Sequence, residues 1–149
     1  MTYNESIIIQ SSTGTQLPFT VFTPDIQSNA ESTFAVNDTR KDLIETIHLT
    51  QLNLKITAPD NSNFRFLKKI ELFIVAEDLE EKRIAWKEDI PGDIEKFLSL
   101  HISNEDLKEY IKKEKFTLRV NTVTDEILTS DHHIDIQSSF FVDAKVLGQ

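Results

Sequence analysis

Two adjacent histidines flanked by aspartates are the residues of this chain that come closest to metal chemistry. They lie in SDHHIDIQSSFFVDAKV (130–146), where Asp131 precedes His132 and His133, and Asp135 follows. Imidazole and carboxylate groups suit zinc, nickel or copper. Neighbouring side chains of a strand point to opposite faces, so His133 can share a face with Asp135 but not with His132. Asp131, His133 and Asp135 are therefore a candidate metal site, and the alternative is the polar entry of a β-strand.

Acidic and amide-rich loops offer calcium as a second metal. Calcium takes roughly six to eight oxygen ligands, usually from a loop that folds around the ion. Loops of this composition recur at TPDIQSN, APDNSN, AEDLEE, KEDIPGD and TVTDEILTSD. Because DNSNFR lacks the glycine and the distal glutamate of an EF-hand, a calcium site would have to combine several loops. The alternative is an acidic surface in contact with water.

The residues needed for catalysis are poorly represented. Carboxylate pairs such as Glu88 with Asp89 occur, but 25 acidic residues produce such pairs by chance. No Gly-x-Ser-x-Gly sequence prepares a serine nucleophile, and no cysteine is present to act as nucleophile, zinc ligand or disulfide partner. The glycines, Gly14, Gly92 and Gly148, are too far apart for a phosphate-binding loop. We expect no enzymatic activity and no cofactor, with a small enzyme as a further alternative.

The net charge argues against a nucleic acid partner, and the short apolar runs argue against a transmembrane segment. Lys and Arg total 16 against 25 Asp and Glu, the formal charge is −9 and no basic run occurs, so we expect no nucleic acid partner. Apolar runs such as 72–76 are far shorter than the roughly 18–20 residues that cross a bilayer, so we expect no transmembrane segment. The location stays open. We expect the envelope or periplasmic side if an upstream lipoprotein signal was removed, and the cytoplasm otherwise.

Apolar residues at every second position predict long strands. The pattern is clearest in two segments, 116–121 and 133–146. Phe141 breaks it, which predicts a bulge or a partly covered outer face. In 47–56, the apolar residues before and after Thr50 fall on opposite faces of a regular strand. A bulge near Thr50 would place them on the same face. The segment 70–76 is apolar on both sides and predicts a central strand.

Shorter strands and two helices complete the predicted elements. We expect strands at ESIIIQ, LPFTVFTP, EKRIAW and FLSLHIS, with Ile84 and Trp86 pointing inward. Ser103, with an acidic residue three positions on, resembles a capping box and predicts a helix in SNEDLKEYIKK. Asn37 or Asp38 would cap a second helix in NDTRKDLIETI, which has apolar residues at helical spacing.

The order of these elements predicts the fold class. About eight strands are separated by turn signals and do not alternate with helices. We therefore expect an all-β fold, a two-sheet antiparallel sandwich of immunoglobulin-like or jelly-roll topology with two short helices. A chain of 149 residues fits one domain, so we expect residues 1–149 to form a single unit.

Prolines mark one strand as a candidate docking edge. LPFTVFTP (17–24) contains Pro18 and Pro24 at its ends, and proline is tolerated on edge strands because it cannot donate to a neighbouring strand. An unpaired edge can receive a strand from a partner protein, which we expect at 17–24. Exposed aromatic residues are expected to form an apolar contact patch, namely Phe19, Phe22, Phe73 and Phe141.

Three stretches carry a family resemblance that covers roughly residues 40–147. They are LNLKITAPDNSNFRFLKKIELFIVAEDLEEKRIAWKEDIPGD, LSLHISNEDLKEYIKKEKFTLRVNTVTDE and HIDIQSSFFVDAKVL. They resemble small secreted or lipid-anchored β-sandwich proteins of Bacteroidetes-type bacteria and, more distantly, the sandwich of LEA-type desiccation proteins. The resemblance implies an envelope-associated domain without catalytic residues, although the lipidated cysteine typical of the group is absent from this chain.

The sequence therefore predicts a non-catalytic binding or structural module associated with the cell envelope, with an unassigned ligand. The first alternative is an adhesion or ligand-binding module that depends on calcium or a transition metal. The second alternative is a small enzyme.

Overall fold

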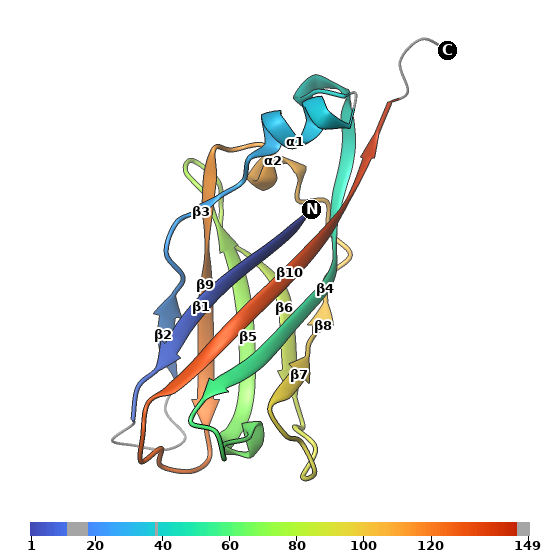
Figure 1. The fold of residues 1–149 in the computed structure, drawn as a ribbon. Coiled ribbons are helices and arrows are strands. Elements are labelled where there is room, and N and C mark those ends of the chain that lie inside the picture. Colours follow the sequence, from blue (N-terminus) through green and yellow to red (C-terminus); the bar gives the residue numbers. More distant parts are fainter. Residues whose placement is uncertain (12–17, 38, 146–149) are drawn as a thin grey trace.

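In the computed structural model, which describes residues 1–11, 18–37 and 39–145, two antiparallel sheets pack face to face (Figure 1). Sheet A has the order β1-β10-β4-β7, with β1 (Thr2–Ile9), β10 (His132–Ala144), β4 (Ile44–Ala58) and β7 (Phe97–Ser99). Sheet B has the order β2-β9-β5-β6-β8, with β2 (Phe19–Phe22), β9 (Lys115–Thr124), β5 (Leu67–Val75), β6 (Lys82–Glu88) and β8 (His101–Ile102). The short β3 (Ile26–Gln27) also pairs with β9. The predicted two-sheet sandwich is confirmed, with ten strands in the described part of the chain.

One of the irregularities in the pairing of β4 with β10 is an extra residue on β4 at Thr50. Ser139 lies opposite Gln51 and Phe140 lies opposite Leu49, so Thr50 has no partner on β10. The predicted bulge near Thr50 is confirmed. Because β4 absorbs the irregularity, β10 keeps a regular alternation and Phe141 points outward, with 60% of its surface exposed.

A second bulge explains why one helix prediction is wrong. A helix was expected from Asn37 onward, but Asn37 ends α1 (Ala30–Val36) and donates to the Phe34 carbonyl. A 3-10 turn, η1 (Lys41–Leu43), follows, and β4 begins at Ile44. The register shifts between Asp143 and Ala144 of β10, so Ile44 and Ile47 are both buried although they are three residues apart. This bulged strand therefore imitates the spacing of a helix.

The other helix begins later than expected. α2 (Lys108–Ile111) starts after Ser103, whose hydroxyl accepts only from the Glu105 amide, at 3.1 Å. The N-cap residue is Leu107, and the preceding Asp106 accepts through Oδ1 from the amides of Lys108 at 3.1 Å and Ile47 at 2.9 Å. Burial raises the pKa of Asp106, but these hydrogen bonds and the charges of Lys108 and His48 outweigh burial and leave the pKa below its usual value.

β6 differs from the sequence expectation at Trp86. Ala85 lies opposite Leu72 and Arg83 lies opposite Phe73, so Ile84 is an extra residue on β6. Ile84 and Ala85 are both fully buried, and Trp86 points to the outer face beside Glu71. The expectation of an inward Trp86 is wrong, because a bulge reverses the parity of every residue beyond it.

The two sides of the sandwich are closed in different ways. On one side, the segment 97–102 leaves sheet A as β7 and joins sheet B as β8, and the Leu100 amide still donates to Leu52. On the other side, β1 ends sheet A while β2 and β3 end sheet B, and β1 lies beside β2 (Figure 1). Buried residues of both sheets and of α1 form one core between these sides. The β1–β2 side is therefore the open side, where separate strand edges meet the solvent.

Candidate functional site

The candidate metal residues lie near the end of sheet A where β10 begins. Asp131 accepts from the Ser11 amide at 2.8 Å, and Asp135 accepts from the Ser6 hydroxyl at 2.7 Å. His133 is exposed on the outer face that Asp135 shares. His132 is buried instead, with its ring 4.9 Å from the Phe66 ring. In the described residues, no three His, Asp or Glu side chains gather as a set of metal ligands.

Addition of calcium, zinc or nickel to chelator-treated protein is expected to leave the melting temperature unchanged. In the described residues, Asp131, His133 and Asp135 do not converge as a set of metal ligands, so they offer no ready-made site for an ion. Thermal unfolding followed by Trp86 fluorescence measures the effect. A rise of several degrees with one ion would contradict this expectation and establish a metal site, because a ligand that binds only the folded state stabilises it.

The β2 edge is open along its whole length in the described structure. The Thr23 amide donates to Leu118 of β9 at 3.0 Å, and the direction of backbone groups alternates along a strand. The N–H and C=O groups of Val21 therefore face β9, whereas those of Thr20 and Phe22 face away. Within the described residues, no backbone hydrogen bond engages these outward groups. The prediction of an edge strand at 17–24 is confirmed for the described part, residues 18–24.

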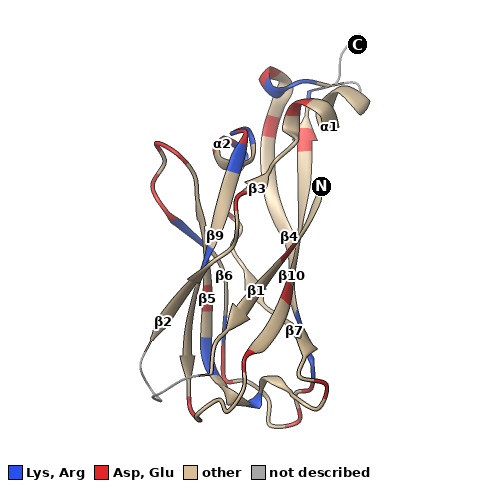
Figure 2. Ribbon diagram, turned by 60° about the vertical axis from the view of Figure 1, so that its left-hand side comes forward, with Lys and Arg blue, Asp and Glu red and all other residues tan. Residues whose placement is uncertain are grey.

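The side chains of β2 make this edge uncharged and partly apolar. The strand reads FTVF, without a charged residue, and is tan throughout in Figure 2. Phe22 exposes 57% of its surface, as expected from the sequence. Phe19 was also expected to face outward, but it packs against the core because it shares the inward parity of Val21. An uncharged edge with one exposed aromatic residue is suited to an extended, apolar segment.

β1 presents the neighbouring edge but carries a charge on its inner side. Glu5 lies opposite Ile136 and shares the inward parity of Tyr3 and Ile7. Burial raises the pKa of Glu5 above its usual value. An inward-pointing charge is one of the devices that discourage unwanted pairing at an edge strand. β1 is therefore better protected against strand addition than β2.

Glu5→Gln is expected to stabilise the protein at pH 7 and to have little effect near pH 3.5. A carboxyl group whose pKa is raised by folding favours the folded state only while it is protonated. Its contribution is therefore present at acidic pH and is lost as the pH rises from the unfolded pKa through the folded pKa. Melting curves of both proteins between pH 3.5 and 7 measure the difference. A difference in melting temperature between the two proteins that becomes smaller towards pH 7 would contradict the inward placement of Glu5.

The outer face of sheet B holds a stripe of stacked arginine and aromatic side chains that no single stretch of sequence reveals. Phe22 on β2 lies opposite Arg119 on β9, whose guanidinium lies 4.2 Å from the centre of the Phe73 ring. On β6, the Arg83 guanidinium lies 4.2 Å from the centre of the Trp86 ring. Only the pairing of the strands brings these residues together.

Each arginine of this stripe is already paired with a carboxylate. Arg119 donates through Nε to Glu81 at 2.6 Å, and Arg83 donates through Nη1 to Glu71 at 3.0 Å. Such pairs fix the side chains on the sheet and neutralise their charge. The stripe therefore stiffens the outer face and presents its aromatic rings, but it leaves neither arginine as a free cation for a phosphate.

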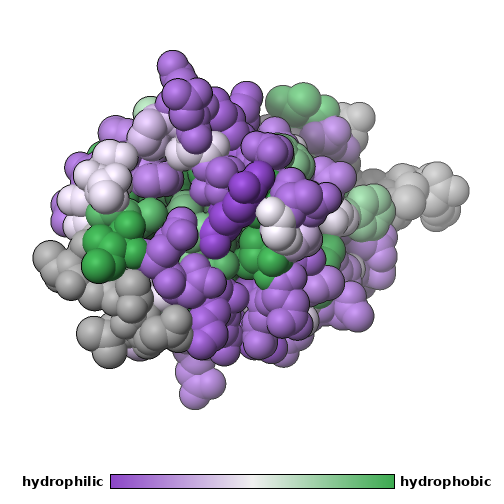
Figure 3. Space-filling model, turned by 90° about the horizontal axis from the view of Figure 1, so that it is seen from below, coloured by the Kyte–Doolittle hydropathy of each residue, from purple (hydrophilic) through white to green (hydrophobic). Residues whose placement is uncertain are grey.

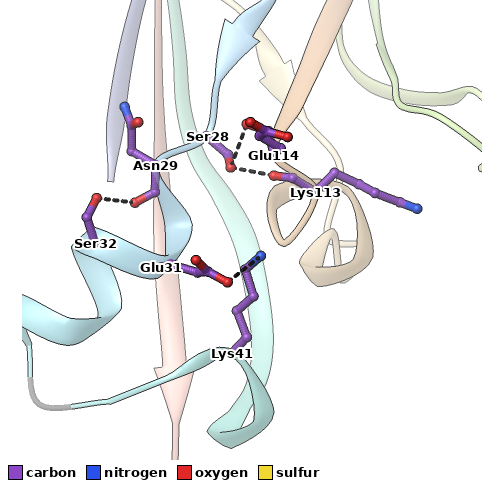
Figure 4. A network of polar contacts seen from close by, with 7 residues as sticks. All are labelled: Ser28, Asn29, Glu31, Ser32, Lys41, Lys113 and Glu114. Atoms are coloured by element: carbon purple, nitrogen blue, oxygen red, sulfur yellow. Dashed lines mark hydrogen bonds and ion pairs between the residues drawn. The ribbon is translucent and has the colours of Figure 1, made fainter.

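Polar contacts fix α1 to the end of β9 (Figure 4). The buried Ser28 hydroxyl donates to the carbonyl groups of Lys113 and Glu114, and the Ser28 carbonyl accepts from the Tyr3 hydroxyl at 2.8 Å. Lys41 forms an ion pair with Glu31 at 3.6 Å. The hydrogen bonds satisfy the buried hydroxyl, so the contacts have a positioning role. They hold α1 above the end of the sandwich.

Among the described residues, the end of the molecule opposite α1 shows no broad apolar surface. Seen from below, hydrophobic side chains form separate patches between hydrophilic ones (Figure 3). Among the described residues, the exposed large hydrophobic side chains are Ile8, Phe22, Val36, Phe97, Ile127 and Phe141. They are scattered over both sheets, α1 and a loop. The longest helix in the described chain has seven residues, and none is long and apolar enough to cross a membrane.

The fold class itself is compatible with a protein that lacks catalytic activity. No protein-family model matches the chain, and no curated protein matches it either. The function must therefore be inferred from the exposed strand edges, the outer faces of the sheets and the cavities of the sandwich.

Proposed function

We propose that this protein is a non-catalytic binding module that receives an extended segment of a partner protein at the β2 edge, residues 18–24. The observation that carries the proposal is the contrast between the two sides of the sandwich. Segment 97–102 closes one side by pairing with both sheets, whereas β2 leaves the backbone groups of Thr20 and Phe22 without partners in the described structure. An added strand would gain main-chain hydrogen bonds there.

The surroundings of β2 support the choice of this edge. β1 carries the inward Glu5, and the strands that close the opposite side are only two and three residues long. β2 lacks charge, and its exposed Phe22 lies beside Arg119 and the stacked rings of sheet B. A partner segment would therefore place alternate apolar side chains against Phe22. The resemblance to envelope proteins of Bacteroidetes-type bacteria supports a location at the cell envelope.

Two proline variants separate binding from folding. Thr20→Pro removes an outward N–H and leaves the bonds to β9, so we expect the fold to persist. Val21→Pro removes an N–H that faces β9, so we expect it to lower the free energy of unfolding by about 1–3 kcal/mol. Urea unfolding of both variants measures the difference. Equal destabilisation would show that the edge is not oriented as described.

The binding test uses peptides selected on the wild-type protein. Eight-residue peptides displayed on phage are selected against immobilised protein and then measured on Thr20→Pro and on the matched control Thr20→Val. We expect peptides with alternating apolar residues that lose at least about tenfold in affinity on Thr20→Pro and keep it on Thr20→Val. Peptides that bind both variants equally well, or the failure of selection, would remove the β2 edge as the binding site.

A further inference from the structure

The outer face of sheet A carries a regular array of polar side chains. The central row of this array crosses all four strands and consists of Asn4, Gln137, Asn53 and Ser99. The rows on either side of it consist of Thr2, Ser139 and Gln51, and of Ser6, Asp135, Lys55 and Phe97. These three rows are called the polar array below.

The polar array forms one continuous, uncovered surface. Each of its side chains is exposed or half-exposed. Neighbouring strands lie roughly 5 Å apart and alternate residues of one strand roughly 7 Å apart, so the rows adjoin one another. In the part of the chain that the structure describes, no helix or loop lies over these rows (Figure 1). A long ligand can therefore lie along a row, across the strands.

The polar array has no net charge, although the protein is strongly acidic. The chain has a formal charge of −9, and 28% of its residues are charged. Within the array, Asp135 and Lys55 are the only charged residues, and they lie opposite each other on β10 and β4. In Figure 2, β1, β10 and β4 show long tan stretches with few coloured bands. The array therefore attracts neither an anion nor a cation by charge.

Hydrogen bonds within the array hold several of its side chains in place. The Ser99 hydroxyl donates to Oδ1 of Asn53 at 2.8 Å, across the β7–β4 pair. The hydroxyl groups of Thr2 and Ser139 lie 3.1 Å apart, across the β1–β10 pair. Side chains that are already ordered lose less conformational entropy when a ligand binds.

The carboxamides of Asn4 and Gln137 are free to bind a ligand. Both side chains are exposed, and within the described residues neither carboxamide makes a hydrogen bond. A carboxamide offers two N–H donors and one carbonyl acceptor. Two adjacent free carboxamides in the central row therefore offer donors and acceptors side by side.

The composition of the array disfavours three classes of ligand. Protein interfaces concentrate aromatic residues, Met and Arg at their centre, but the central row holds none of these. A phosphate-bearing ligand needs several basic side chains, and Lys55 is the only one in the array. A membrane surface needs an apolar face, which the array does not provide. The ligand that fits is uncharged and carries closely spaced groups that both donate and accept hydrogen bonds.

We propose that the polar array binds a neutral, extended polysaccharide. Sugar hydroxyl groups both donate and accept hydrogen bonds, which matches the carboxamides and hydroxyls of the central row. Phe97, which exposes 54% of its surface at the β7 margin, provides an aromatic ring for the apolar face of one sugar ring. The sugar chain would lie along the central row, from Asn4 to Ser99, with Phe97 beside its end.

This inference goes beyond the proposed function and is independent of it. The polar array belongs to sheet A, whereas the β2 edge belongs to sheet B. Thr20→Pro changes only the β2 edge, so it should leave polysaccharide binding unchanged. Loss of binding at one surface therefore does not decide the outcome at the other.

The test titrates uncharged tetrasaccharides into isotope-labelled protein and follows them by NMR. The probes are cellotetraose, xylotetraose, mannotetraose and maltotetraose. Tetragalacturonate has the same number of rings but carries a carboxylate on each, so it is the anionic control. The side-chain amide groups of Asn4, Gln51, Asn53 and Gln137 give signals of their own, which report contacts at the array directly.

Two variants with the same change of charge separate the array from the rest of the surface. Gln137→Glu replaces a carboxamide of the central row by a carboxylate, and Asn104→Asp makes the same replacement at an exposed residue before α2. The backbone amide signals of both variants show whether the fold is kept.

We expect at least one uncharged tetrasaccharide to shift the side-chain amide signals of Asn4, Gln137 and Asn53. Its affinity should fall at least about fivefold on Gln137→Glu, which removes the N–H donors, and should be unchanged on Asn104→Asp. The proposal would be overturned if none of the four tetrasaccharides bound, or if the shifted signals lay away from the array. Equal affinity for the two variants, or a stronger response to tetragalacturonate, would overturn it as well.

Discussion

Leu54→Ala is expected to lower the free energy of unfolding by about 2–5 kcal/mol, the range for deleting a fully buried leucine side chain. Leu54 is completely buried in the middle of β4, where it lies opposite Ile136 of β10 and Leu98 of β7. The strands on both sides restrict how far the structure can collapse into the cavity, so the value should lie in the upper half of this range. Urea unfolding measures this loss of stability. The unfolding is followed by the fluorescence of Trp86, which lies on the opposite sheet.

The neighbouring residue provides the control for this prediction. Lys55 is exposed on the outer face of the same strand, so Lys55→Ala should change the free energy of unfolding by less than about 0.5 kcal/mol. Trp86 lies on sheet B, so its signal reports Leu54→Ala only if both sheets unfold together. A loss below about 1 kcal/mol would mean that Leu54 is not part of a tightly packed core.

Phe34→Ala is expected to lower the free energy of unfolding by about 3–5 kcal/mol if α1 unfolds together with the sheets. Phe34 is buried beneath α1, and its carbonyl accepts from the amides of Asn37 and Thr39. A helix of seven residues has little stability alone, so packing through Phe34 and Ala30 must hold it in place. Phe34 also lines a cavity between α1 and the end of β10, so the same change enlarges this cavity.

Hydrogen exchange distinguishes a global effect from the release of the helix. The Thr33 amide donates to Asn29, so its exchange reports the integrity of α1. Rapid exchange at Thr33 with an unchanged urea midpoint would show that α1 opens separately from the sandwich. Val36→Ala serves as the matched control, because Val36 is 83% exposed and should affect neither measurement. Unchanged values of both quantities in Phe34→Ala would contradict the anchoring role of Phe34.

The strands were predictable wherever the alternation was regular, and two of the errors, the inward Trp86 and the helix from Asn37 onward, arise at bulges. The parity of β10 and the irregularity at Thr50 could both be read from the sequence. The extra residue at Ile84 could not, because Ile84 and Trp86 share a parity and both are large and apolar. Likewise, the bulge between Ile44 and Ile47 gave a spacing of three that is typical of a helix. Local sequence cannot tell these cases apart, since the pairing partner decides where a bulge forms.

The candidate sites also differ in whether the sequence alone could predict them. The β2 edge was predictable because prolines leave a local signal in the sequence. The aromatic and arginine stripe of sheet B, in contrast, draws on residues from separate strands. The metal site that the sequence suggested at Asp131, His133 and Asp135 has no cluster of ligands behind it in the described residues, and the metal titration tests it.

The measurement that tests the account most directly is amide hydrogen exchange along β2 in the unbound protein. An edge that is free to receive a strand must leave Thr20 and Phe22 exchanging rapidly, while Val21, bonded to β9, exchanges slowly. We expect this alternation, with a difference of at least about tenfold between neighbouring residues. If Thr20 and Phe22 exchange as slowly as Val21, the edge is already covered in the unbound protein, and strand addition at β2 is contradicted.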